Sequence, residues 1–167
     1  MTDEAHDQSH GETAISFMIS TDHILLGREV ASKVDVLRVI GEVLLAAGDV
    51  TERYVLGMFQ KEAQYGTWMT DGIAMPHGTN EVKSEVLRNS IVLVQLPDGV
   101  DWGKGRMVGL AIGLAGKGDE QHMELLASLA GVIQQQELVE RLVTSQNKDE
   151  IIEILTRYGH MAREERQ

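Results

Sequence analysis

His77 has the local sequence that is most typical of a reactive side chain in this protein. The residue lies between a proline and a glycine in the segment 72–78, GIAMPHG. Pro76 fixes its own φ and favours an extended Met75, while Gly78 permits a backbone geometry that a side chain would block. The imidazole is therefore predicted to be held in one direction. At a pKa of about 6.5 it is mostly neutral near pH 7 and offers a lone pair to an electrophile such as a phosphoryl group. An inert histidine in a surface turn fits the same local pattern.

A second histidine, His122, follows Asp119 at the start of a predicted apolar-faced helix. The first turn of a helix has free backbone N–H groups and the positive end of the dipole, which stabilise an anion brought close and disfavour a cationic imidazole. Neutral His122 is therefore predicted to donate a hydrogen bond to such an anion. A partly exposed histidine at a helix start, without a role in chemistry, is the alternative.

Two motifs carry a family resemblance. Residues 72–79, GIAMPHGT, resemble the phosphorylation-site motif of the mannitol/fructose class of enzyme IIA in the bacterial phosphotransferase system, and residues 122–130, HMELLASLA, resemble its second histidine motif. The resemblance extends from about Leu25 to Tyr158. It implies that His77 takes a phosphoryl group from phosphorylated HPr on Nε2, with Nδ1 fixed by a backbone carbonyl, and passes it to an enzyme IIB domain. It also implies that His122 steers and stabilises that group.

Three further side chains are candidates for stabilising the phosphoryl group. In the family an arginine commonly precedes a glutamate about fifteen residues ahead of the active histidine, and this chain has Lys61-Glu62 there. Lysine supplies the charge without the planar fork of arginine, and a solvated lysine on a polar helix face is equally compatible. Asp71 is predicted to orient a ring or to cap a turn, with capping favoured. Thr79 is predicted to bond the phosphate or the loop backbone.

Composition excludes several classes of function. The 167 residues contain 15 Lys plus Arg against 26 Asp plus Glu, a formal net charge of −11, and no cysteine. This balance disfavours nucleic-acid binding and favours basic protein partners or plain solubility, and the lack of cysteine excludes a disulfide scaffold and a thiolate metal site. No run approaches the ~18 apolar residues of a membrane span, and residues 1–11 resemble neither a signal nor a transit peptide. We expect a cytoplasmic protein without direct membrane insertion.

Known cofactor and hydrolase motifs are absent from the sequence. The glycines around 99–105 and 116–118 lack the spacing of a phosphate-binding P-loop, and neither a His-Glu-x-x-His zinc motif nor a Gly-x-Ser-x-Gly nucleophile elbow occurs. We therefore expect no metal ion and no cofactor.

The hydrophobic pattern predicts the elements that position these residues. A strand within 15–26 is followed by helices after Ser32 and from Thr51 to about Tyr65, strand-like segments at 67–75, 91–96 and 107–115, and helices from Asp119 onward. Predicted details are a turn at 97–99, a solvated charged segment at 80–88, and a buried face of the 119 helix formed by Met123, Leu126, Leu129, Ala130 and Ile133. The order predicts a single α/β domain over 15–160, a mixed β-sheet flanked by helices, with a mobile tail at 1–14 and a frayed end at 161–167.

The favoured function is that of a phosphocarrier of the sugar phosphotransferase system, with His77 as the phosphohistidine. Mannitol is favoured over fructose because residues 76–79, PHGT, and residues 96–100, LPDGV, look more like the mannitol branch. Two alternatives stay open. One is a regulatory phosphoacceptor of the same fold, and the other is a non-catalytic interaction module in which Lys61 marks lost activity.

Overall fold

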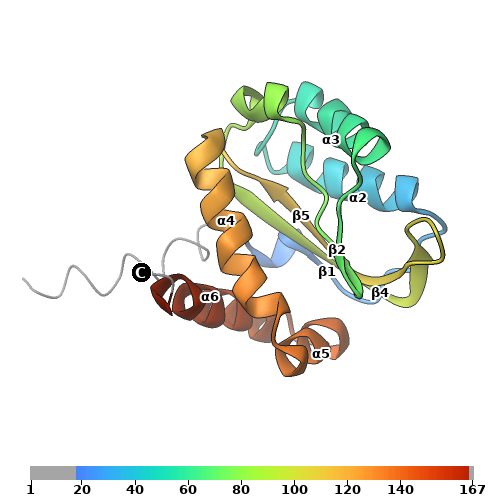
Figure 1. Ribbon diagram of the computed structural model, residues 1–167, viewed down its shortest axis with the longest axis vertical. Coiled ribbons are helices and arrows are strands. Elements are labelled where there is room, and N and C mark those ends of the chain that lie inside the picture. The colour runs from blue at the N-terminus through green and yellow to red at the C-terminus, as the bar shows by residue number, and fades with distance from the viewer. Residues whose placement is uncertain (1–17, 166–167) are drawn as a thin grey trace, which may run out of the picture.

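A mixed five-stranded sheet, in the order β1-β4-β5-β3-β2, lies at the centre of the protein (Figure 1). The computed structural model describes residues 18–165. The strands are β1 (Ile24–Leu25), β2 (Trp68–Thr70), β3 (Gly72–Ala74), β4 (Ser90–Asp101) and β5 (Met107–Ala115). β1 pairs with β4 and β3 with β5 in parallel, whereas the pairs β4/β5 and β2/β3 are antiparallel. The predicted fold class, a mixed β-sheet flanked by helices, is confirmed.

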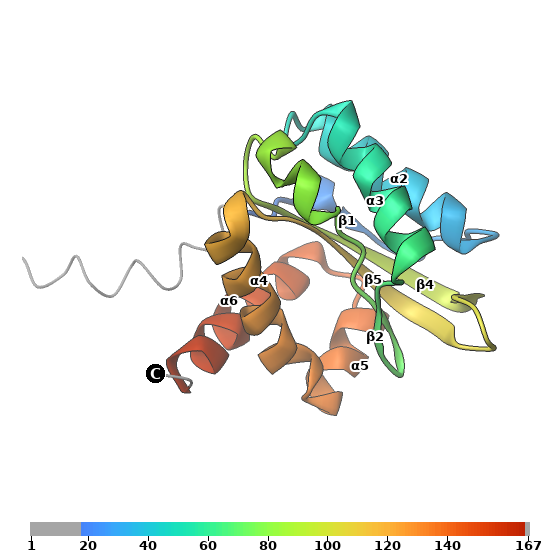
Figure 2. The ribbon, with the colours of Figure 1, turned by 45° about the horizontal axis from the view of Figure 1, so that its top comes forward.

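Helices cover both faces of this sheet (Figure 2). One face carries α2 (Lys33–Ala46) and α3 (Glu52–Gln64), and the other carries α4 (Gly118–Ile133), α5 (Gln136–Thr144) and α6 (Lys148–Glu165). Two short 3-10 helices, η2 (Thr21–His23) and η3 (Asn80–Glu85), precede β1 and β4. The predicted order of elements is therefore largely confirmed.

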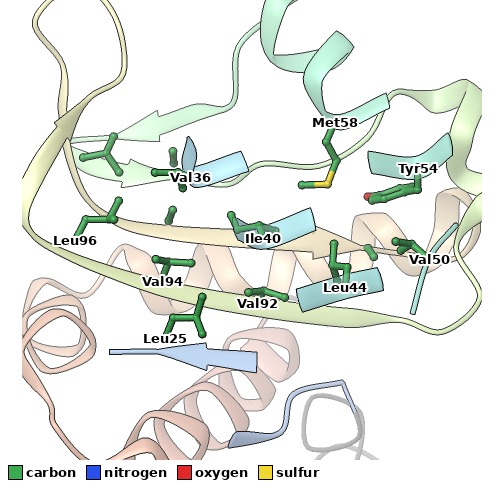
Figure 3. Close-up of a cluster of buried hydrophobic side chains, with 14 of the residues drawn as sticks. Leu25, Val36, Ile40, Leu44, Val50, Tyr54, Met58, Val92, Val94 and Leu96 are labelled. Atoms are coloured by element: carbon green, nitrogen blue, oxygen red, sulfur yellow. The ribbon is translucent and has the colours of Figure 1, made fainter. Parts of the chain in front are cut away.

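The central strands β4 and β5 contain long apolar runs because side chains on both of their faces are buried there. In β4, Ile91 and Leu93 belong to the core beneath α4, α5 and α6, while the alternate residues Val92 and Val94 belong to the core beneath α2 and α3. Figure 3 shows the second core, in which Ile40 lies among these valines. Helix α2 begins as predicted, because the Ser32 side chain accepts a hydrogen bond from the backbone N–H of Asp35 at 3.3 Å. It ends before Gly48, whose φ is 74°.

A buried carboxylate fastens the first helical layer to the chain segments around it. Asp49 accepts hydrogen bonds from His23 Nε2 at 2.8 Å and from Arg88 Nε at 2.8 Å. Burial raises the pKa of this carboxyl, but the hydrogen bonds from His23 and Arg88 outweigh burial and leave the pKa below its usual value. Asp49 is therefore ionised and fully paired inside the protein.

Two strand predictions were wrong in extent. Of the strand predicted within 15–26, only Ile24–Leu25 is a strand, since residues 21–23 form η2 and residues 15–17 lie outside the described part. The turn predicted at 97–99 is not the end of its strand, because β4 continues to Asp101 with a register shift between Gln95 and Val100. Pro97 has no N–H for the ladder and Gly99 has a φ of 74°, both of which suit an irregularity inside a strand.

The predicted buried face of α4 was right in part. Met123 is 62% exposed, and the residues of this helix that are buried are His122, Leu125, Ser128, Leu129 and Val132. Of the predicted face, Leu129 is buried and Leu126 and Ile133 pack against the core, but the purely apolar pattern missed the histidine and the serine that share the inner face. The charged segment 80–88 is likewise not simply solvated, because it contains η3 with a buried Val82.

The predictions for the chain ends concern segments that the structure describes only in part. The tail predicted at 1–14 lies outside the described residues. Helix α6 continues to Glu165, into the segment 161–167 for which the sequence predicted a frayed end.

Candidate active site

Strand β3 delivers His77 to one end of the sheet. The parallel pairing of β3 with β5 continues past Ala74, because the backbone N–H of Leu114 donates to the Pro76 carbonyl at 2.9 Å. Met75 is fully buried, and its own N–H donates to the carbonyl of Thr67 at 2.8 Å. The chain leading to His77 is therefore part of the sheet framework, and His77 is the point at which it leaves the sheet.

The imidazole of His77 is held by the backbone. Its Nδ1 lies 2.8 Å from the carbonyl oxygen of Met75. A carbonyl can only accept, so this contact assigns the proton to Nδ1 and leaves the lone pair on Nε2. Burial lowers the pKa of His77, the Met75 carbonyl opposes this, and the charge of Lys61 lowers it further. At pH 7 the half-buried ring is a neutral base with one nitrogen free to react.

Gly78 is required for space rather than for unusual backbone angles. Its φ is not in the left-handed region. A Cβ on this residue would lie 2.8 Å from Cε2 of Tyr54 and 2.8 Å from Cγ2 of Val82. The sequence indicated a glycine-specific geometry, and the structure supplies a different reason for it: α3 and η3 pack directly on the chain after His77.

The structure brings His122 to His77. The two ring centroids are 5.0 Å apart, with the ring planes at 50°. Helix α4 begins at Gly118, one residue before the predicted start, so His122 lies just beyond the first turn. At 6% exposed it is buried rather than partly exposed. Burial lowers the pKa of His122 to about 4, helped by the nearby His77, Lys83 and Lys61. His122 is therefore neutral at pH 7.

Two ammonium groups act on this pair of rings. The charges of Lys61, in α3, and Lys83, in η3, both lower the pKa values of His77 and His122. The Lys61 ammonium lies 4.6 Å from the ring centre of Tyr65, and the Lys83 ammonium lies 2.7 Å from Asp119 Oδ1.

Sequence reasoning missed Lys83, because the mixed charges of 80–88 are typical of a solvated surface. Its side chain is only 15% exposed. Its position six residues after His77, in the short helix that follows the reactive loop, is the signal that could have found it.

The other two predicted residues differ in their relation to the site. Asp71 is exposed in the turn between β2 and β3. Gly72 pairs with Val108 at one end of β5 whereas Pro76 is bonded to Leu114 near the other, so Asp71 is at the far end of the strand, roughly 20 Å along the chain from His77. The structure does not bring Asp71 to the histidines.

Thr79, in contrast, is buried next to the reactive loop. Its carbonyl accepts a hydrogen bond from the N–H of Val82 at 3.2 Å, which starts η3.

A buried acid supports the same loop from α3. Glu62 follows Lys61 and accepts a hydrogen bond from the hydroxyl of Thr67, the residue whose carbonyl holds the N–H of Met75. Its other oxygen lies 3.7 Å from the Lys33 ammonium. Glu62 therefore links α3 to the segment that orients His77, and its negative charge raises the pKa of His77 against the effect of burial.

Residues 18–165 contain no group of three or more histidine or acidic side chains arranged to hold a metal ion. None of the helices in this described part is long and apolar enough to cross a membrane.

Together, the sheet, the two helical layers and the paired neutral histidines define an α/β protein with an oriented imidazole at one end of its sheet. Residues 17–158 match the family described as "Phosphoenolpyruvate-dependent sugar phosphotransferase system, EIIA 2". The chain belongs to this family and is a phosphotransferase component, the enzyme IIA of such a system.

The relatives of this chain include proteins of known specificity. The mannitol-specific phosphotransferase enzyme IIA component of Bacillus subtilis (strain 168) is 36% identical over 82% of this chain and 95% of its own length. The crystal structure of IIA mannitol from Escherichia coli superposes with a TM-score of 0.76 at 35% identity, covering 83% of this chain and 99% of that one. The IIA chain in the complex with phosphorylated enzyme IIB from the same organism gives 0.75 at 33% identity, covering 82% and 96%.

Proposed function

We propose that Nε2 of His77 is the phosphoryl acceptor of this enzyme IIA. The hydrogen bond between Nδ1 and the Met75 carbonyl carries this proposal, because it leaves Nε2 as the one ring nitrogen with a free lone pair. In the transfer, a bond forms between Nε2 and phosphorus while the bond from phosphorus to the donor nitrogen breaks, and the donor imidazole departs with that electron pair. The second transfer repeats the exchange with a nucleophile of the acceptor.

The neighbours of His77 suit a loose transition state, in which in-line positioning and charge stabilisation are the main tasks of the protein. His122, neutral and 5.0 Å away between ring centres, donates an N–H to the phosphoryl oxygens. Lys61 and Lys83 supply positive charge, since both act on both rings. Thr79 contributes through the backbone that starts η3, and Asp71 has no part in the transfer.

We infer the partner proteins from the net charge of this chain and from its relatives. We assign the donor role to phosphorylated HPr, whose basic groups would be attracted to a chain of net charge −11. The acceptor is an enzyme IIB domain, as in the Escherichia coli complex, and the substrate of the whole system is mannitol, as the name of the Bacillus relative states for that protein. The site of action is the cytoplasm.

Intact-mass measurement after incubation with phosphoenolpyruvate, enzyme I and HPr tests the acceptor. The wild type and His10→Ala, a control histidine outside the described residues, are expected to gain the mass of one phosphoryl group, and His77→Ala to gain none. His122→Ala should be labelled more slowly. A wild type that stays unmodified, or a His77→Ala variant that is labelled, contradicts the proposal.

Presenting the labelled protein to purified mannitol and fructose IIB domains then tests the acceptor and the sugar. We expect loss of label to the mannitol domain at the higher rate. Faster loss to the fructose domain contradicts the mannitol assignment, and retention of the label with both contradicts the carrier role.

A further inference from the structure

A closed chain of hydrogen bonds surrounds the peptide groups on either side of His77. The backbone N–H of Leu114, in β5, donates to the Pro76 carbonyl at 2.9 Å. The carbonyl of the same Leu114 accepts from the Tyr54 hydroxyl at 2.6 Å. That hydroxyl in turn accepts from the backbone N–H of Gly78 at 3.1 Å. Both peptides that flank His77 are thus fastened to one residue of the central sheet, one directly and the other through Tyr54.

The hydroxyl of Tyr54 suits this task because it must donate and accept at once. Burial raises the pKa of Tyr54 to about 12, so its proton is present under all working conditions. The side chain is 2% exposed and lies at one end of the core beneath α2 and α3 (Figure 3). Its ring also occupies the space that a side chain on Gly78 would need, because Cε2 is only 2.8 Å from the place that a Cβ would take. The same side chain therefore both bonds the Gly78 peptide and closes the space beside it.

We propose that Tyr54 is a positioning residue for phosphoryl transfer, which its hydroxyl serves by fixing the Gly78 peptide to β5 and thereby the direction of the His77 ring. This inference rests on the proposed function of His77. Without the hydroxyl, the Pro76 side of the loop stays attached to Leu114 but the Gly78 side does not. The backbone at His77 can then turn, and the contact between Nδ1 and the Met75 carbonyl loosens.

That loosening has two measurable effects. The Met75 carbonyl holds the proton on Nδ1, so a weaker contact allows a mixture of the two ring tautomers, with Nε2 protonated in part of the population. A misplaced nucleophile also reacts more slowly, because an error of about 1 Å in a reacting group can reduce the rate by about a hundredfold.

The test compares Tyr54→Phe with Ile154→Val, a control at a buried site in the core on the opposite face of the sheet. For each protein, imidazole nitrogen-15 NMR reports the tautomer of His77, and quench-flow with phosphorylated HPr reports the transfer rate. We expect Tyr54→Phe to show mixed tautomers and a rate about ten- to a hundredfold lower. Ile154→Val should retain the wild-type tautomer and rate while losing thermal stability.

The two assays separate the possible failures. A folded Tyr54→Phe with the wild-type tautomer and a rate within twofold of wild type overturns the inference. A wild type that accepts no phosphoryl group refutes the role of His77, while the tautomer comparison still tests whether Tyr54 orients the ring.

If Tyr54→Phe does not fold, 3-fluorotyrosine at position 54 serves as the second variant, since it keeps the hydroxyl and weakens it as an acceptor. We then expect an upfield shift of the Gly78 amide proton and a reduced rate. An unchanged Gly78 amide with an unchanged rate overturns the inference.

Discussion

Burial of His122 makes the stability of the folded protein dependent on pH. Its pKa is about 4 in the folded state and 6.5 when unperturbed. Because the folded pKa is the lower one, the unfolded chain binds the proton first as the pH falls. Stability is therefore present in full above pH 6.5 and is lost between 6.5 and about 4.

The size of the loss follows from the shift. Each pH unit between the two values favours the unfolded state by about 1.4 kcal/mol. Lowering the pH from 7 to 5 should therefore remove about 2 kcal/mol of stability through His122 alone. His122→Gln keeps a polar side chain at this position and cannot titrate, so it should lack this part of the loss.

The assay is urea unfolding of both proteins at fixed ionic strength, in steps from pH 7 to pH 5. Titrating groups that lie away from His122, such as Asp49, are common to both proteins and cancel in the difference. We expect the wild type to lose about 2 kcal/mol more than His122→Gln over this range. Parallel curves for the two proteins would refute the reasoning, as would an NMR titration of His122 with a midpoint near 6.5 in the folded wild type.

Two further substitutions test other parts of the structure. Asp49→Asn removes the buried charge that pairs with the buried His23 and the exposed Arg88. We expect it to lower the free energy of unfolding at pH 7 by about 3 kcal/mol, measured by urea denaturation. A change below about 0.5 kcal/mol would show that the pairing contributes little. Asp71 lies at the end of β3 that is distant from His77. We therefore expect the rate at which phosphorylated HPr labels Asp71→Asn to stay within twofold of wild type. A tenfold slower Asp71→Asn would place that carboxylate in the transfer after all.

The fold was predictable where local patterns and tertiary packing agree. β4 and β5 have continuous apolar runs because both faces of the central strands are buried. The residues that cap and end α2 can be recognised in the sequence. The motif around His77 indicated an oriented ring, and the carbonyl that orients it lies only two residues away.

The remaining features depend on contacts between distant segments. Part of the buried face of α4 was missed because two polar residues, His122 and Ser128, lie on it. The sequence around Lys83 is typical of an exposed charge, and only the packing of η3 against α4 places this side chain near the site. Tyr54 lies 24 residues from Gly78 and 60 from Leu114, so no local pattern reveals that one hydroxyl joins them.

The outermost strands of the sheet are short, with two residues in β1 and three in β2. Such edges offer a passing polypeptide very few unpaired backbone groups, so the sheet is poorly suited to grow by adding a strand from another molecule. A protein with such short edge strands can bind other chains repeatedly without forming stable backbone pairing with them. The short edge strands therefore favour transient association with partner proteins, as does the chemistry at the end of the sheet.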